Sequence, residues 1–365
     1  MIASVSRAGK HQNLSHIRHR GTETRRNRGG ERRAVYSNGM LLTADPPPTW
    51  DNLYFPPRDY SYFEGLRNTP VNAAWMVDAA ILAYGKSGPE AIGPLKFSRI
   101  LKDAGFDHQA LIGDWSQAPS GTQGFFACND KFAIVAFRGT EKEDWHDLAA
   151  DLAAAPVEEN AAASHESILN RLKRNIPLAA LDVLLDPTAS IVHFGFQLAL
   201  NAVWLEVSRW LEDYVKSFPG AEVCFTGHSL GAALATLAAG RFNKGKTSLF
   251  TFGSPRTANK AFCIKVRANT QGRVFRFVNN TDLVTTVPLE GKWYAHVPEV
   301  SLHFRESGDL EQIPSRATVL SEVLGVFEMS ARAAASQLEQ SKTVPDSLRD
   351  HSPGRYLYRV RRSFR

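Results

Sequence analysis

The chain has 365 residues, of which 43% are hydrophobic and 22% are charged. This composition excludes collagen-like, coiled-coil and wholly disordered proteins. No apolar run approaches the roughly 20 residues that cross a bilayer, so no transmembrane segment is expected. Three scattered cysteines suit neither a disulfide scaffold nor a zinc site: Cys128, Cys224 and Cys263.

The net charge of +6 comes from one end of the sequence. Residues 1–35 contain nine Lys or Arg and two acidic residues, so this segment carries +7 and the rest of the chain −1. Residues 1–45 are therefore predicted to be a disordered, Arg-rich extension, and residues 46–365 a single domain. The extension has three interpretations: a solvated tail (with Met40 as the true initiator), a transit peptide, or a basic arm that binds nucleic acid or anionic lipid. The first is preferred, and no nucleic-acid partner is expected.

The start of the sequence bears on localisation. The extension lacks the 7–15-residue apolar region of a secretory signal peptide. Cytoplasmic localisation is therefore the default expectation, with non-classical secretion left open.

The first half of the domain mixes helices and strands. Prolines at 46–48 and 56–57 indicate an extended lead-in. Apolar spacing predicts helices over residues 71–84 and 95–104. Strands are predicted over 110–115, 124–128 and 131–137, with Asn129-Asp130 as a hairpin turn between the last two.

The second half alternates strands with helices. After a polar, Ala-rich stretch of weak periodicity at 141–190, a long helix is predicted over 196–215. Strands at 223–226, 248–252 and 273–278 then alternate with helices at 229–241 and 258–268. Such alternation is typical of a mostly parallel sheet with helices on both faces, which makes the fold class α/β.

Residues 227–231, Gly-His-Ser-Leu-Gly, match the G-x-S-x-G pattern of a nucleophile elbow. The pattern alone is weak, but here it lies between a predicted buried strand and an Ala-rich helix. In that setting Ser229 sits on a sharp turn that exposes its hydroxyl, and the two glycines let strand and helix approach closely. The alternative is a Gly-Ser turn with no chemistry.

A nucleophilic serine needs a base and an acid, which in this type of site follow it as acid and then base. Asp282 stands out because it closes the predicted strand that starts at residue 274. Its alternative role is a turn-forming aspartate. The spacing favours His351 as the base but leaves the choice open. The other downstream candidates are the bases His296 and His303 and the acids Glu290, Glu306, Asp309, Asp346 and Asp350.

Several segments in order resemble the class 3 lipase family of the α/β-hydrolase superfamily. They are Ala-Phe-Arg-Gly-Thr-Glu (136–141), Asp-Trp (144–145), Val-His-Phe-Gly-Phe (192–196), the elbow (226–231), Phe-Gly-Ser-Pro-Arg (252–256), residues 277–288 and Asp-His (350–351). The resemblance spans about residues 130–355.

The resemblance implies an α/β-hydrolase fold and a serine esterase or lipase that needs no cofactor or metal. It implies Ser229 as nucleophile, Asp282 as acid, His351 as base, and Thr140 and Leu230 as the oxyanion hole. Triacylglycerol, phospholipid (a phospholipase A activity) and small soluble esters all remain open as substrates, since fold does not fix substrate. A different class of interpretation is a non-catalytic protein that keeps this scaffold and binds anionic surfaces.

A lid is expected near the site. Trp145 stands among charged residues just after Thr140, and a lid or insertion is predicted within residues 141–190. Such amphipathic pieces can shield a site in water and turn toward a lipid surface. The sequence therefore predicts peripheral contact with lipid through Trp145, the alternative being that Trp145 only packs against the core.

Overall fold

A computed structural model describes residues 70–85, 94–113, 121–139, 156–159, 189–297, 300–314 and 349–363, all of which lie within the unit Ala44–Arg365. The predicted extension at 1–45 lies outside these ranges, and so does most of the predicted lid region at 141–190. The division into an extension and a domain therefore stays a prediction.

An eight-stranded sheet forms the centre of the described residues, in the order β1-β2-β3-β6-β7-β8-β9-β10. The five adjacent strands β3, β6, β7, β8 and β9 run parallel to one another. At the two edges of the sheet, β1, β2 and β3 pair antiparallel, and so do β9 and β10. The strands are β1 (His108–Ile112), β2 (Gly124–Cys128), β3 (Phe132–Phe137), β6 (Glu222–His228), β7 (Lys246–Phe252), β8 (Val274–Asn279), β9 (Val300–Phe304) and β10 (Leu310–Pro314). This is the mostly parallel, helix-flanked sheet of the α/β-hydrolase fold, as the sequence predicted.

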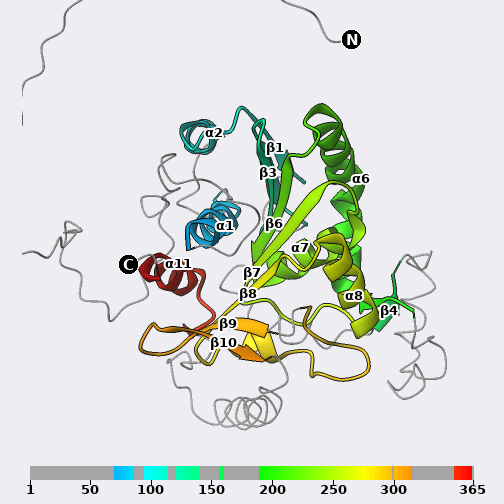
Figure 1. Cartoon of the computed structure of the whole chain (residues 1–365), viewed down its shortest axis with the longest axis vertical. Coiled ribbons are helices and arrows are strands. Elements are labelled where there is room, and N and C mark those ends of the chain that lie inside the picture. The colour runs from blue at the N-terminus through cyan, green and yellow to red at the C-terminus, as the bar shows by residue number, and fades with distance from the viewer. Residues whose placement is uncertain are drawn as a thin grey trace, which may run out of the picture. The chain divides into compact units, whose positions relative to one another are not determined.

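Helices cover both faces of the sheet (Figure 1). One face carries α1 (Pro70–Leu82), α2 (Pro94–Asp103) and α11 (Pro353–Arg362), and the other carries α6 (Phe194–Ser217), α7 (Leu230–Arg241) and α8 (Lys260–Asn269). Successive strand residues alternate between two cores: Phe126 and Val135 pack with α6 and α7, whereas Phe125 and Ile134 pack with α1. This is the period-2 alternation expected of strands that are buried on both sides.

The observed elements follow the predicted ones to within a few residues. The predicted turn at Asn129 is present. The side-chain oxygen of Asn129 accepts hydrogen bonds from the backbone N–H groups of Lys131 and Phe132, which stabilise the turn. A short antiparallel pair, β4 (Pro156–Glu158) with β5 (Ile191–His193), was not predicted, and neither were α11 and β10.

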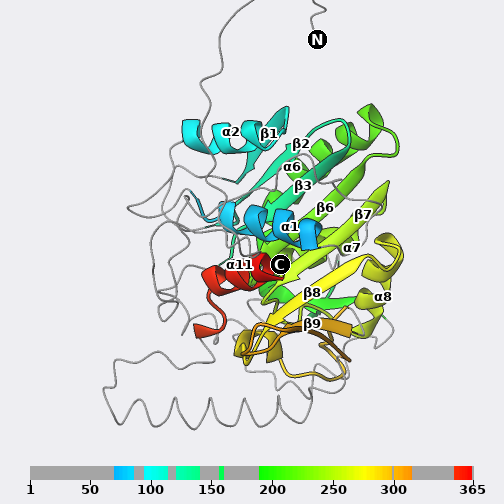
Figure 2. The same cartoon turned by 60° about the vertical axis from the view of Figure 1, so that its left-hand side comes forward.

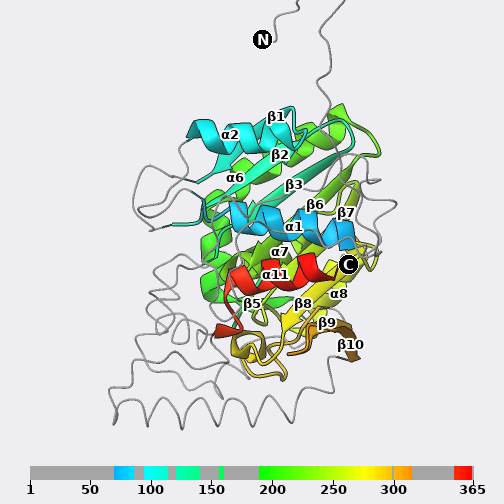
Figure 3. The ribbon, with the colours of Figure 1, turned by 90° about the vertical axis from the view of Figure 1, so that its left-hand side faces the viewer.

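Helix α1 is present as the apolar spacing predicts, but its apolar residues are not confined to one face. Residues 72–83 are buried all round, because α1 packs against both the sheet and α11. Figures 2 and 3 show α1 and α11 side by side over the sheet. The buried Asp78 of α1 is paired with Arg361 of α11 at 2.8 Å, so the charge that breaks the apolar pattern of α1 joins the two helices.

None of the helices in the described ranges is long and apolar enough to cross a membrane. Within the same ranges, no group of three or more His, Cys, Asp or Glu side chains could hold a metal ion.

Candidate active site

The candidate nucleophile lies on a strained turn between β6 and α7. Ser229 has φ 58° and ψ −128°, a conformation that a non-glycine residue adopts only when its surroundings impose it. The surroundings are tight: a Cβ added at Gly227 would lie 2.3 Å from the backbone of Gly231, and one added at Gly231 would lie 2.2 Å from the carbonyl oxygen of Phe137. The two glycines predicted to allow close approach are therefore sterically required.

The hydroxyl of Ser229 is buried and makes no hydrogen bond to the part of the chain that the structure describes. Its backbone N–H donates to the Phe252 carbonyl of β7 at 3.0 Å. Leu230 is the first residue of α7, where backbone N–H groups lack intrahelical acceptors and the helix dipole is positive. The serine thus stands beside a site suited to negative charge.

Asp282 and His351 are brought together from segments 69 residues apart. Asp282 follows β8, and His351 precedes α11. The Nδ1 atom of His351 lies 2.8 Å from both carboxylate oxygens of Asp282. Because a carboxylate accepts, Nδ1–H donates, and in a neutral ring Nε2 then carries the lone pair.

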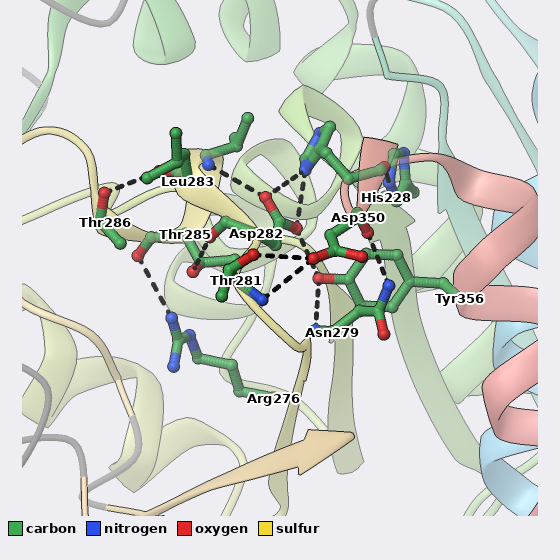
Figure 4. Close-up of polar contacts among 12 residues, drawn as sticks. His228, Arg276, Asn279, Thr281, Asp282, Leu283, Thr285, Thr286, Asp350 and Tyr356 are labelled. Carbon is green, nitrogen blue, oxygen red and sulfur yellow. Dashed lines mark hydrogen bonds and ion pairs between the residues drawn. The ribbon is translucent and has the colours of Figure 1, made fainter. Parts of the chain in front are cut away.

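Two further groups donate to Asp282 (Figure 4). The Val284 N–H donates to Oδ1 at 3.0 Å, and the Tyr356 hydroxyl of α11 donates to Oδ2 at 2.6 Å. Burial, followed by the Asp282 charge, raises the pKa of Tyr356 well above its ordinary value of 10. Tyr356 therefore remains a donor at any pH at which the protein is assayed.

The His351 segment contacts the elbow through His228, the residue before Ser229. His228 Nε2 donates to the His351 carbonyl oxygen at 2.8 Å, and the two rings lie 4.6 Å apart. Burial, and next the neighbouring His351, lowers the pKa of His228 well below 6.5, so this ring is neutral. Since Nε2 carries its proton, Nδ1 accepts from the Tyr84 hydroxyl at 2.9 Å.

Gly253 completes the link between the three residues. It follows Phe252, whose carbonyl binds the Ser229 N–H, and it has φ +60°. A Cβ at this position would lie 2.9 Å from Asp282 Oδ2 and 3.0 Å from His351 Cε1. The ends of β6, β7 and β8 therefore bring Ser229, Asp282 and His351 to one edge of the sheet, where sites of parallel sheets lie.

The remaining predicted residues divide into three groups. Leu230 lies beside Ser229 as expected. Thr140 and Trp145 lie outside the described residues. His296 contacts Arg276 and the Thr285 carbonyl, and His303 lies in β9; neither forms the hydrogen bond to Asp282 that His351 forms within the described residues.

Three contributors were missed from the sequence: Tyr356, Tyr84 and the partner role of His228. Their contacts with the site join residues 74 to 144 positions apart. One local signal was present: residues 356, 357 and 360 form an apolar stripe on an otherwise basic segment, which favours an amphipathic helix directly after His351.

Curated relatives match part of this chain. It is 37% identical over 110 residues to the secreted mono- and diacylglycerol lipase A of Penicillium cyclopium, which is 29% of this chain and 35% of that protein. It is 42% identical over 97 residues to the secreted mono- and diacylglycerol lipase LIP4 of Malassezia restricta, which is 26% of this chain and 32% of that protein. The match thus spans about a third of the length of these relatives.

Solved structures align over a longer range at lower identity. The mono- and diacylglycerol lipase of Aspergillus oryzae aligns at 19% identity and a TM-score of 0.49, covering 68% of this chain and 87% of that one. The Yarrowia lipolytica LIP2 lipase aligns at 19% identity and a TM-score of 0.48, covering 66% and 83%.

The expectation of cytoplasmic localisation is wrong on this comparison, because these curated relatives are named as secreted proteins. The expectation was based on the lack of a recognisable signal peptide in the sequence. Such an absence does not determine where a protein acts.

A family model described as lipase (class 3) matches residues 134–292, the range that holds most of β3, the elbow, β7, β8 and Asp282. Over these residues, which make up less than half of the chain, this protein is similar to the class 3 lipase family.

Proposed function

We propose that this protein is a serine-dependent carboxylic ester hydrolase that acts on lipid esters, with Ser229 as nucleophile, His351 as base and Asp282 as the acid that orients it. The main support is the His351–Asp282 contact at 2.8 Å, which directs Nε2 of a neutral ring away from the carboxylate. The strained, buried Ser229 supplies the hydroxyl.

In the proposed reaction, His351 Nε2 takes the proton of Ser229 Oγ while Oγ attacks the ester carbonyl carbon. The resulting oxyanion is held by the Leu230 N–H at the start of α7 and by Thr140 as a second donor. The carbon–oxygen bond to the alcohol breaks, and the alcohol leaves with the proton from Nε2. Water then attacks the acyl-enzyme, gives a proton to Nε2, and Ser229 Oγ recovers it.

Replacement of Ser229 tests this assignment. Ser229→Ala should remove hydrolysis of nitrophenyl esters and labelling by a fluorophosphonate probe, while the protein stays folded. Ser208→Ala, which removes an exposed hydroxyl on α6, is the matched control and should keep both. The proposal would be refuted if Ser229→Ala hydrolysed the ester at the rate of the wild type, or if the probe did not label the wild type.

Mono- and diacylglycerols are the proposed substrates, by analogy with the printed names of the relatives. Mono-, di- and triacylglycerols and phosphatidylcholine should be compared at equal acyl length. Hydrolysis of phosphatidylcholine alone would assign the enzyme as a phospholipase A instead.

Trp145 is the proposed lipid-contacting residue of a lid. Activity on a long-chain ester should rise once the substrate exceeds its solubility limit, and Trp145→Ala should reduce that activity far more than activity on a soluble short-chain ester. Equal losses on both substrates would leave Trp145 as a packing residue.

A further inference from the structure

Asp350, the residue before His351, is buried, and its carboxylate joins the turn before Asp282 to helix α11. Figure 4 shows its contacts with Thr281. Its Oδ2 accepts three hydrogen bonds from the turn before Asp282: from Asn280 Nδ2 at 2.9 Å, Thr281 N at 3.2 Å and Thr281 Oγ1 at 2.8 Å. Its Oδ1 accepts from Arg355 Nη1 of α11 at 2.6 Å. Its carbonyl oxygen accepts from Asn279 Nδ2 at 2.8 Å.

Residues 279, 280 and 281, which directly precede the proposed acid, therefore all donate to the residue that directly precedes the proposed base. We propose that Asp350 is a positioning residue for the reaction: it fixes the His351 ring against Asp282 and thereby aims Nε2 at Ser229. This inference rests on the proposed function.

The turn that Asp350 holds is one that needs holding. Asn280 has φ 45°, in the left-handed region that non-glycine residues rarely adopt. Hydrogen bonds to an ionised acceptor are shorter and stronger than neutral ones, so one carboxylate with four donors can impose this backbone geometry. Arg355 balances the charge that is buried in doing so.

Position matters here more than stability. Catalytic groups that shift by about 1 Å from their productive geometry can lose about 100-fold in rate. Neither Asp350 nor its turn donors contact the Asp282 carboxylate or the His351 ring through the hydrogen bonds described above. Asp350 should therefore affect turnover through the relative placement of two loops.

A simpler alternative is that Asp350 only anchors α11. The same helix offers a matched control, because the buried Asp78 of α1 is also paired with an α11 arginine, Arg361, at 2.8 Å. Asp78 lies on helix α1 and makes no hydrogen bond to the turn at 279–282 among the contacts described above. If anchoring α11 were all that mattered, losing either ion pair would have the same effect on activity.

The decisive comparison is Asp350→Asn against Asp78→Asn. An asparagine has one acceptor oxygen, so at position 350 it can face either the turn or Arg355, and its NH₂ group then opposes a donor on the other side. We expect Asp350→Asn to lower kcat about 10- to 100-fold with KM within about twofold of the wild type, measured well below the unfolding temperature. Asp78→Asn should lower the unfolding temperature and leave kcat within about twofold.

Thr281→Val gives a milder second variant in case Asp350→Asn folds poorly. It removes one of the donors to Asp350 at an exposed position and should lower kcat by about three- to tenfold with little change in unfolding temperature. The double variant should lose less than the product of the two single losses, because both act on one contact.

Fluorophosphonate labelling separates the two proposals. A wild type that neither hydrolyses esters nor labels overturns the proposed function, and the role of Asp350 with it. The positioning role alone is overturned by either of two results, provided that the wild type labels at Ser229. In the first, Thr281→Val and Asp350→Asn both keep the kcat of the wild type. In the second, Asp350→Asn and Asp78→Asn lose activity equally.

Discussion

The Tyr356 hydroxyl has two buried partners, so Tyr356→Phe is a sharp perturbation. The hydroxyl donates to Asp282 Oδ2 at 2.6 Å and accepts from the Asn279 N–H at 3.0 Å. Loss of a hydrogen bond to a charged group costs about 1.5–3 kcal/mol, and a buried N–H left without an acceptor costs about 1–3 kcal/mol. We expect the free energy of unfolding to fall by about 3 kcal/mol in total.

For a domain of roughly 320 residues, 1 kcal/mol shifts the unfolding temperature by roughly 1.5 °C, so Tyr356→Phe should unfold roughly 4–5 °C below the wild type. Because Asp282 also loses a donor that fixes its orientation, kcat for a nitrophenyl ester should fall about tenfold. Differential scanning calorimetry and initial-rate kinetics measure the two effects.

Tyr214 provides the matched control. Its ring is equally buried, in α6, but its hydroxyl has no hydrogen-bond partner within the described ranges. Burial raises the pKa of this hydroxyl, so it too is neutral. Tyr214→Phe should leave activity unchanged and stability equal or higher, since an unsatisfied buried hydroxyl is removed. If the two variants unfold at the same temperature and turn over equally, the reasoning about Tyr356 is refuted.

Three further outcomes follow from the same structure. Gly231→Ala should prevent folding of the elbow, because its Cβ would lie 2.2 Å from the Phe137 carbonyl oxygen; soluble, active Gly231→Ala would contradict this, and Gly291→Ala, which meets no atom within 4 Å, is the control. Burial raises the pKa of the half-buried Glu222 from 4.5 to about 7. The contribution of Glu222 to the free energy of unfolding is therefore fully present below pH 4.5 and is lost as the pH rises through about 7. Thermal scans at pH 5 and pH 8 should therefore show a smaller drop for Glu222→Gln than for the wild type, by about 1 kcal/mol after allowance for solvent screening, and parallel drops would exclude Glu222 as the cause. Because the His228 ring is a neutral donor to the His351 carbonyl, His228→Phe should lower kcat at every pH from 6 to 9 alike, and a loss confined to the acidic end would show that His228 titrates.

Much of the fold could be predicted because its signals are local. The strand before the elbow is a continuous apolar run, α6 repeats its apolar residues every three or four positions, and Gly227 and Gly231 lie two residues on either side of Ser229. Each pattern reflects a constraint within one element. The observed boundaries differ by only a few residues, as expected where helix ends depend on caps.

The chemistry around Asp282 could be predicted less fully, because it depends on long-range contacts. Spacing left His296, His303 and His351 as alternative bases, and only the resemblance to a family chose among them. The contributions of Tyr356 and Tyr84 depend on how α11 and α1 pack against the sheet, and nothing in the local sequence specifies a partner 74 or 144 residues away.

The position of His351 along the chain sets an order of events during synthesis. The elbow and every strand of the eight-stranded sheet are complete by residue 314, whereas the proposed base arrives only with residues 349–363. A ribosome-bound chain exposed as far as β10 has a strained serine but no imidazole to take its proton. On the proposed mechanism, hydrolytic power is therefore acquired in one late step, when α11 docks beside α1. Until that step, the proposed reaction cannot start, because nothing takes the proton of Ser229.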